Sequence, residues 1–83
     1  MQNNIYVLYN RLSNRYGDVI SFASDGFAVA RIQPTLEKNG QLEENELCRV
    51  GKIDIENGTI ETEQAPIRIA WRETIENKPT KEI

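Results

Sequence analysis

An Asn-Gly dipeptide at residues 57–58, set between two runs of alternating apolar residues, constrains the fold of this chain more than any other feature. Both residue types tolerate the positive φ angles of a two-residue type I′ turn, so residues 47–63 predict a β-hairpin. A turn centred on this dipeptide sets Ile55 opposite Ile60. Ile53 then shares one face of the hairpin with both of them.

The first strand of this hairpin predicts an irregularity at Gly51. Cys48 and Val50 lie an odd number of residues from Ile53, so a regular strand would direct them to the opposite face. A glycine inside a strand pattern often marks a β-bulge, which adds one residue and restores the face. We therefore expect a bulge at Gly51 that places Cys48, Val50, Ile53 and Ile55 on one buried face.

Two further strands are predicted near the N-terminus. Residues 5–9 carry apolar side chains at both parities, which is typical of a central strand covered on both faces. A polar segment that ends at Gly17 interrupts this pattern, and residues 18–23 resume β character. The two strands are expected to pair as a hairpin.

A helix is predicted to begin at Ser24-Asp25, because either side chain can cap the free N–H groups of a first turn. Pro34 removes one helical hydrogen bond at a cost of about 3 kcal/mol. The helix is therefore expected to end near Gln33, or to kink and run one more turn to Lys38. Its apolar stripe, which should lie on the sheet, consists of Ala28, Val29, Ile32 and Leu36.

The C-terminal part predicts one more strand and a tail. Residues 67–72 alternate Ile, Ile and Trp with Arg, Ala and Arg, which indicates a fifth strand with a basic outer face. Residues 76–83 are polar and without period, so we expect a single domain over residues 1–75 and a disordered tail. The predicted fold class is α+β: an antiparallel sheet of about five strands with one helix on one face, in the order β-β-α-β-β-β.

The residue inventory argues against catalysis and metal binding. The 83 residues include no histidine and one cysteine, Cys48, so neither an intrachain disulfide nor a Ser/His or Cys/His nucleophile pair can form. No glycine-rich phosphate loop is present, and a thiol in a buried strand stays protonated. We therefore expect a protein that is not an enzyme and needs no cofactor or metal. Without a membrane span or a signal peptide, a cytoplasmic location is expected.

Arginines near aromatic rings indicate a candidate site for single-stranded nucleic acid, since such sites combine stacking surfaces with cationic side chains. One group lies in the first loop and the other flanks Trp71. In the alternative interpretation, Tyr6, Tyr9 and Trp71 belong to the core and the arginines only solubilise the surface. The candidate nucleic-acid-binding residues are Arg11, Arg15, Tyr16, Arg68 and Arg72.

The order of these segments resembles the small nonstructural protein of gokushoviruses, which are microvirus phages with single-stranded DNA genomes. The resemblance covers roughly residues 5 to 62. It rests on a short Tyr-Val-Leu strand at residues 6–8 and on the helix start Phe-Ala-Ser-Asp-Gly-Phe-Ala-Val-Ala-Arg at residues 22–31. It rests also on Leu-Cys-Arg-Val-Gly-Lys-Ile-Asp at residues 47–54, followed by Asn-Gly-Thr-Ile at residues 57–60.

The resemblance implies a phage accessory protein without catalytic residues, acting in viral DNA replication or in the switch to single-stranded DNA synthesis and packaging, in the cytoplasm of the host cell. Single-stranded DNA and a host or viral replication protein are the implied partners. The net charge of −3 is unfavourable for phosphate binding. A protein-interaction module, such as an inhibitor that presents its acidic C-terminal half to a host protein, is therefore the alternative, and a role in capsid assembly is a third. Because the core is thin, we also expect a homodimer that shares a sheet face or edge.

Overall fold

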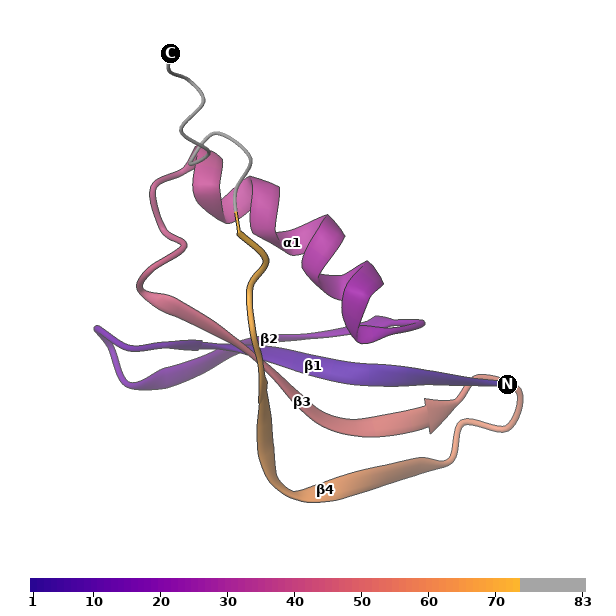
Figure 1. Cartoon of the computed structure of the whole chain (residues 1–83). Coiled ribbons are helices and arrows are strands. Elements are labelled where there is room, and N and C mark those ends of the chain that lie inside the picture. The colour runs from indigo at the N-terminus through magenta and orange to yellow at the C-terminus, as the bar shows by residue number, and fades with distance from the viewer. Residues whose placement is uncertain (74–83) are drawn as a thin grey trace.

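The computed structural model describes residues 1–73. One antiparallel sheet in the order β2-β1-β3-β4 carries a single helix on one face (Figure 1). The antiparallel sheet, the single helix and the central place of the first strand confirm the prediction, but the described residues form four strands where five were expected. The elements are β1 (Gln2–Asn10), β2 (Arg15–Phe22), α1 (Asp25–Lys38), β3 (Asn45–Asp54) and β4 (Ile60–Ile69).

The two strands predicted after the hairpin turn are one bent strand, β4. Thr62 pairs with Gly51 and Ile67 pairs with Arg49, so four residues of β4 lie opposite Val50 alone. Pro66 falls inside this bulge, where the ladder needs no N–H donor. Both halves of β4 pair with β3, so the expected fifth strand is the second half of β4 and not a separate strand. The tail predicted at residues 76–83 lies outside the described residues.

The turn between β3 and β4 is longer than the predicted two-residue turn. Ile53 pairs with Ile60, and the Asp54 N–H donates to the Thr59 carbonyl at 2.9 Å, so residues 55–58 form the loop. The Asp54 side chain accepts N–H bonds inside the loop, and Gly58 adopts a φ of +77°. This local hydrogen bonding favours the longer loop over the type I′ turn. Because the register moves by two residues, Ile53 and Ile60 still share a face.

The bulge predicted at Gly51 is confirmed, since Val50 is the extra residue of β3 opposite β1. The glycine is required for a second reason: a Cβ at Gly51 would lie 2.4 Å from the Glu61 carbonyl oxygen of β4. The predicted buried face is wrong in part. Cys48 is buried and Ile53 is half-buried on the same face, whereas Ile55 lies in the loop and is 48% exposed.

Helix α1 begins where it was predicted to begin, with the Ser24 hydroxyl accepting from the Phe27 N–H at 3.1 Å. It runs past Pro34 to Lys38, the longer of the two predicted alternatives. Gln33 was expected outside the apolar stripe but is only 5% exposed. Among the residues described, no helix has the length and apolar character to cross a membrane.

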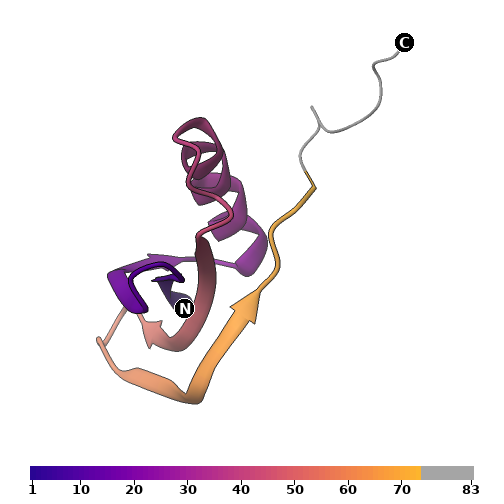
Figure 2. The ribbon, with the colours of Figure 1, turned by 90° about the vertical axis from the view of Figure 1, so that its left-hand side faces the viewer.

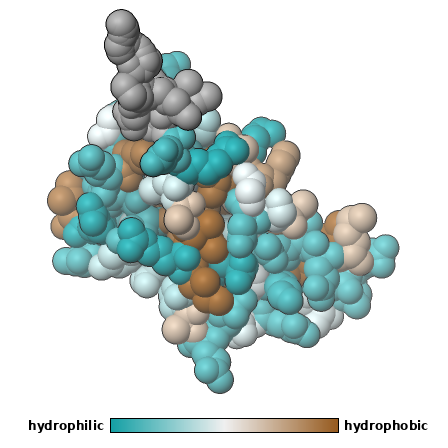
Figure 3. Space-filling model, viewed as in Figure 1, coloured by the Kyte–Doolittle hydropathy of each residue, from teal (hydrophilic) through white to brown (hydrophobic). Residues whose placement is uncertain are grey.

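The core lies between α1 and the sheet, which curls as β3 and β4 bend away from β1 (Figures 1 and 2). Residues far apart in sequence meet here because the sheet places β1 between β2 and β3. In one view of the surface, hydrophobic side chains gather in a narrow band between hydrophilic flanks (Figure 3). The buried cluster is Tyr6, Ala28, Val29 and Leu47, with Leu8, Ile20, Phe22, Ile32, Ile69 and Trp71 packed against it.

Candidate functional site

Most of the predicted binding residues lie at the end of the sheet where β1 meets β2, β3 begins and β4 ends. The loop at residues 11–14 is shaped by Asn10, whose Oδ1 accepts from the N–H groups of Leu12 and Ser13 at 2.9 Å each. Asn14 adopts a φ of +58°, a conformation that asparagine tolerates. This ordered turn holds Arg11 and Arg15 on either side of the loop. We call this region the arginine end.

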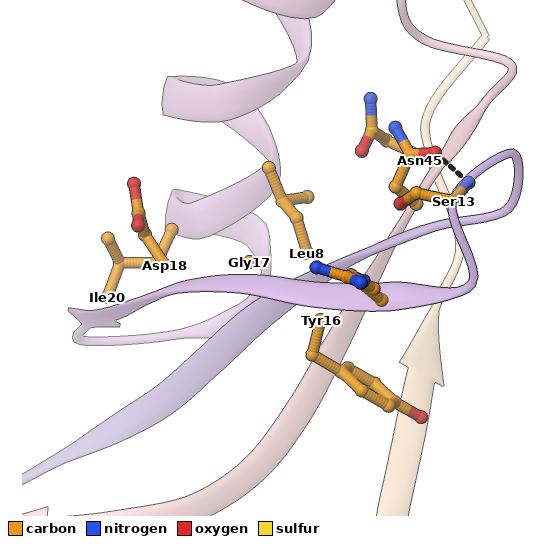
Figure 4. Close-up of a pocket in the computed structure, with 9 residues that line it drawn as sticks. Leu8, Ser13, Tyr16, Gly17, Asp18, Ile20 and Asn45 are labelled. Atoms are coloured by element: carbon orange, nitrogen blue, oxygen red, sulfur yellow. Dashed lines mark hydrogen bonds between the residues drawn. The ribbon is translucent and has the colours of Figure 1, made fainter.

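The first hollow of the arginine end has a volume of about 410 Å³ and is open to solvent. Figure 4 shows Leu8 and Ile20 on its floor, on the side of the sheet that carries the helix, while the Tyr16 ring lies on the opposite side of β2. Arg15 and Asp18 supply one positive and one negative charge to its wall. The lining residues are Leu8, Asn10, Ser13, Arg15, Tyr16, Gly17, Asp18, Ile20 and Asn45.

The Tyr16 ring belongs to an aromatic pair on the side of the sheet without the helix. Its centroid lies 4.8 Å from that of Tyr9, its register partner on β1. The Tyr9 hydroxyl donates to Asn14 Oδ1 at 2.9 Å, which fixes the inner ring. Tyr16 is 54% exposed, so its free ring surface can accept a stacked base or another flat group.

The second hollow has a volume of about 190 Å³ and lies next to the first, since Asn45 lines both. A guanidinium nitrogen of Arg11 donates to the Glu43 carbonyl oxygen at 2.5 Å. The Trp71 indole N–H donates to the Asn45 carbonyl oxygen at 3.1 Å, which holds the ring against the protein. Two acidic and two basic side chains contribute to the lining, which consists of Arg11, Leu42, Glu43, Asn45, Glu46, Arg68 and Trp71.

The structure thus brings together four of the five predicted site residues. Arg15 and Tyr16 line the first hollow, and Arg11 and Arg68 line the second. Arg72 lines neither hollow. Its backbone N–H and carbonyl are bonded to the side-chain amide of Gln33, and its side chain is exposed.

A second polar group, which the sequence did not reveal, joins the helix start to the sheet. Asp25 was expected only as a helix cap, but its carboxylate accepts from the Tyr6 hydroxyl and from Arg49, each at 2.6 Å. Asn4 donates to the Tyr6 hydroxyl at 3.0 Å, and Arg49 also pairs with Glu63 at 3.6 Å. One signal in the sequence could have revealed this group. Arg49 lies two residues after Leu47 and so on the same face of β3, which otherwise packs against the core.

The protonation states of this polar group follow from its geometry. Burial raises the pKa of Asp25, but the bonds from Tyr6 and Arg49 outweigh this effect and hold that pKa below its ordinary value. Burial, followed by the bond to Asp25, raises the pKa of Tyr6 to about 12. The ion pair and the neutral phenol are therefore kept near neutral pH, and the group serves to fasten α1 to β1 and β3.

The buried thiol of Cys48 offers no nucleophile near neutral pH. Burial raises its pKa, and nearby Glu46 acts in the same direction while Arg68 opposes it. Within residues 1–73, no three His, Cys, Asp or Glu side chains are grouped in a way that could hold a metal ion. The chemistry available at the arginine end is therefore binding through charge, hydrogen bonds and ring stacking.

Comparison with known proteins returns no match: no protein-family model, no curated protein and no solved structure is similar to the chain at a significant level.

Proposed function

We propose that this chain is a non-enzymatic phage accessory protein that contacts single-stranded DNA through its arginine end. The observation that supports DNA contact is the convergence of Arg11, Arg15 and Arg68 on two adjoining hollows, with the exposed ring of Tyr16 on the other side of β2. The resemblance to the gokushovirus small nonstructural protein supports the place of this contact in viral DNA replication or in the switch to single-stranded DNA synthesis and packaging.

The three arginines are suited to phosphate groups. A guanidinium carries five N–H donors in a planar fork that matches phosphate oxygens. The bond from Arg11 to the Glu43 carbonyl uses one of these donors and orients the group, which leaves others for a ligand. Arg15 and Arg68 are both exposed. A DNA strand that runs along this end of the sheet can therefore contact the three arginines one after another.

The aromatic pair favours single strands over duplex DNA. Unpaired bases can stack on Tyr16, whereas bases inside a duplex present no free face. Asp18, Glu43 and Glu46 line the same hollows and oppose the phosphate charge. We therefore expect weak, strongly salt-dependent binding that is measurable at low ionic strength.

The test is a fluorescence anisotropy titration with a labelled oligothymidylate at about 50 mM salt, where phosphate contacts contribute strongly. Arg15→Ala and Arg68→Ala should each weaken binding by roughly 3- to 10-fold, because each removes one phosphate contact. Tyr16→Ala should weaken it by at least about 5-fold through lost stacking. The matched control is Lys52→Ala, which removes the same charge from an exposed position on β3 outside the two hollows.

Two results would contradict DNA binding at the arginine end. One is the absence of any anisotropy change at this salt concentration. The other is an equal loss for Lys52→Ala and the arginine variants, which would show that only the net charge matters. A preference for duplex over single-stranded DNA would reject the role given to Tyr16.

The acidic side chains in the same hollows favour a second function, in which the site binds a basic surface of a host or viral replication protein. Glu43 is exposed in the second hollow and separates the two functions. Glu43→Lys should strengthen oligonucleotide binding if DNA is the ligand, because it replaces a repelling charge with an attracting one. If a basic protein is the ligand, a purified viral replication protein with a basic surface should bind the wild-type chain and lose affinity for this variant.

A further inference from the structure

The face of the sheet opposite the helix carries an apolar strip across all four strands. The register places Val19 of β2, Val7 of β1 and Cys48 of β3 in one cross-strand row. Ile5 follows on β1, and Ile53 pairs with Ile60 at the far end. We call this set the outer strip: Val19, Val7, Ile5, Cys48, Ile53 and Ile60.

The outer strip is separate from the core that α1 covers. Tyr6 and Leu8 of β1 face the helix, so the alternation of a strand directs Ile5 and Val7 the other way. No member of the strip belongs to the cluster beneath α1, which lies on the opposite face (Figures 1 and 2). The bulge at Val50 makes the strip continuous, because it returns Ile53 to the face of Cys48.

Several side chains of the strip remain exposed. Val19 is 69% exposed and Ile60 is 55% exposed, Ile5 and Ile53 are half-buried, and Val7 and Cys48 at the centre of the strip are buried. Removing apolar surface from water stabilises a contact by roughly 25 cal/mol per Å², so the gain from docking on this face comes mainly from Val19 and Ile60. The dimer that the thin core predicts needs an apolar surface other than Tyr6, which is buried completely beneath the helix. The strip now provides the apolar surface for it.

We propose that the outer strip packs against the same strip of a second copy, which makes the chain a homodimer with two sheets face to face. Charge favours this occupant. Among the residues that the register pairs on this face, only Glu46 and Arg68 are charged, and their signs are opposite. Two copies with a net charge of −3 each therefore meet little repulsion on this face. A twofold contact that brings Glu46 of each copy near Arg68 of its partner would pair these opposite charges.

Single-stranded DNA and a strongly charged protein fit the strip less well. A nucleic acid needs several cations, and the strip borders only Arg68. Arg11 lies in the loop and Arg15 lines the hollow on the helix side, so both remain free when two strips meet. Arg68 and the Tyr16 ring lie on the face that the dimer covers, so the dimer and the proposed DNA contact compete for these two residues. Sedimentation in the absence of DNA tests the dimer by itself.

Sedimentation equilibrium of the full chain over about 1 to 300 µM tests the dimer, since a reversible dimer depends on protomer concentration. Val19→Lys and Ile60→Lys should each weaken association by at least about 10-fold, because a lysine cannot be buried unpaired at the contact. Both positions are exposed, so the variants should fold, which circular dichroism checks. The matched control is Leu12→Lys, which adds the same charge at a loop position that is 76% exposed.

A dimer that Leu12→Lys leaves unchanged and both strip variants weaken is the expected result. A wild-type chain that sediments as a monomer at about 300 µM overturns the proposal, since such weak association leaves the strip without this partner. A dimer that both strip variants leave intact also overturns it, because the copies then meet elsewhere. If Val19→Lys abolishes oligonucleotide binding while the wild type stays monomeric, the strip belongs to nucleic acid instead.

Discussion

The hydroxyl of Tyr6 donates a 2.6 Å hydrogen bond to Oδ1 of Asp25, although 19 positions separate the two residues in the sequence. Tyr6 lies in the centre of the sheet with no exposed surface, and Asp25 is the first residue of α1. Arg49 of β3 donates to the other carboxylate oxygen. One side chain thus ties the helix to two strands.

Asp25→Asn should destabilise the fold by about 1–2 kcal/mol, because it removes the charge that Arg49 and Tyr6 contact in a partly exposed site. Urea unfolding at neutral pH measures the change. Asp18→Asn is the matched control, since Asp18 is an exposed residue of β2 at the edge of the sheet. An equal loss of stability in both variants would mean that the network around Asp25 contributes nothing specific.

The stability that Asp25 provides should also depend on pH. Its pKa is lower in the folded state than its ordinary value of 3.8. The contribution is therefore fully present above that ordinary value and is lost as the pH falls through the folded pKa. The difference in urea midpoint between wild type and Asp25→Asn should stay constant from neutral pH to about pH 5 and shrink toward pH 3. A difference that does not change over this range would refute the ionic role of Asp25.

Tyr6 should ionise only at strongly alkaline pH, with a pKa of about 12. A folded pKa above the ordinary value of 10 favours the neutral phenol. The stability that Tyr6 provides is thus present below pH 10 and lost as the pH rises through about 12. Tyrosinate absorbance in an alkaline titration measures this ionisation, and Tyr6→Phe should remove a late component that titrates near pH 12. A wild-type titration without a late component would contradict the burial of this hydroxyl.

Gly51→Ala should destabilise the chain by about 2–3 kcal/mol, because the new methyl would meet the Glu61 carbonyl 2.4 Å away on β4. Gly26→Ala is the matched control. A Cβ at Gly26 meets nothing within 4 Å in the first turn of α1, so this change should stabilise by up to about 1 kcal/mol. Thermal unfolding of both variants gives the comparison. A neutral Gly51→Ala would show that β4 does not pass so close to β3.

Gln33→Met should release the segment that follows β4. The Gln33 side-chain amide donates to the Arg72 carbonyl at 2.5 Å and accepts from the Arg72 N–H at 2.9 Å. It thus satisfies both backbone groups of Arg72, as a neighbouring β-strand would. Methionine has a similar size but lacks both bonds. Acrylamide quenching of Trp71, the single tryptophan, should increase, while Gln41→Met, at an exposed loop position, should change it little. Equal quenching in wild type and Gln33→Met would rule out the anchoring role.

The sequence by itself determined the elements whose signals are local. The cap at Ser24, the apolar stripe of α1 and the alternation in residues 47–54 depend on neighbours within a few positions, so they could be predicted. The bulge beside Gly51 followed from the parity of the apolar residues and from the glycine within the strand pattern. The candidate arginines and Tyr16 could likewise be identified from their local sequence. Their positions relative to one another could not be predicted.

Only the tertiary structure decided which of these elements meet. The longer loop before Ile60 formed because Asp54 found partners among the loop N–H groups, and β4 remained one strand because both its halves pair with β3. Gln33 can be buried because the Arg72 backbone supplies both a donor and an acceptor for its side-chain amide. These outcomes depend on contacts between distant residues, whose free energy is set by the whole fold. Those contacts place Arg11 and Arg68 in the lining of one hollow and leave Val19 exposed.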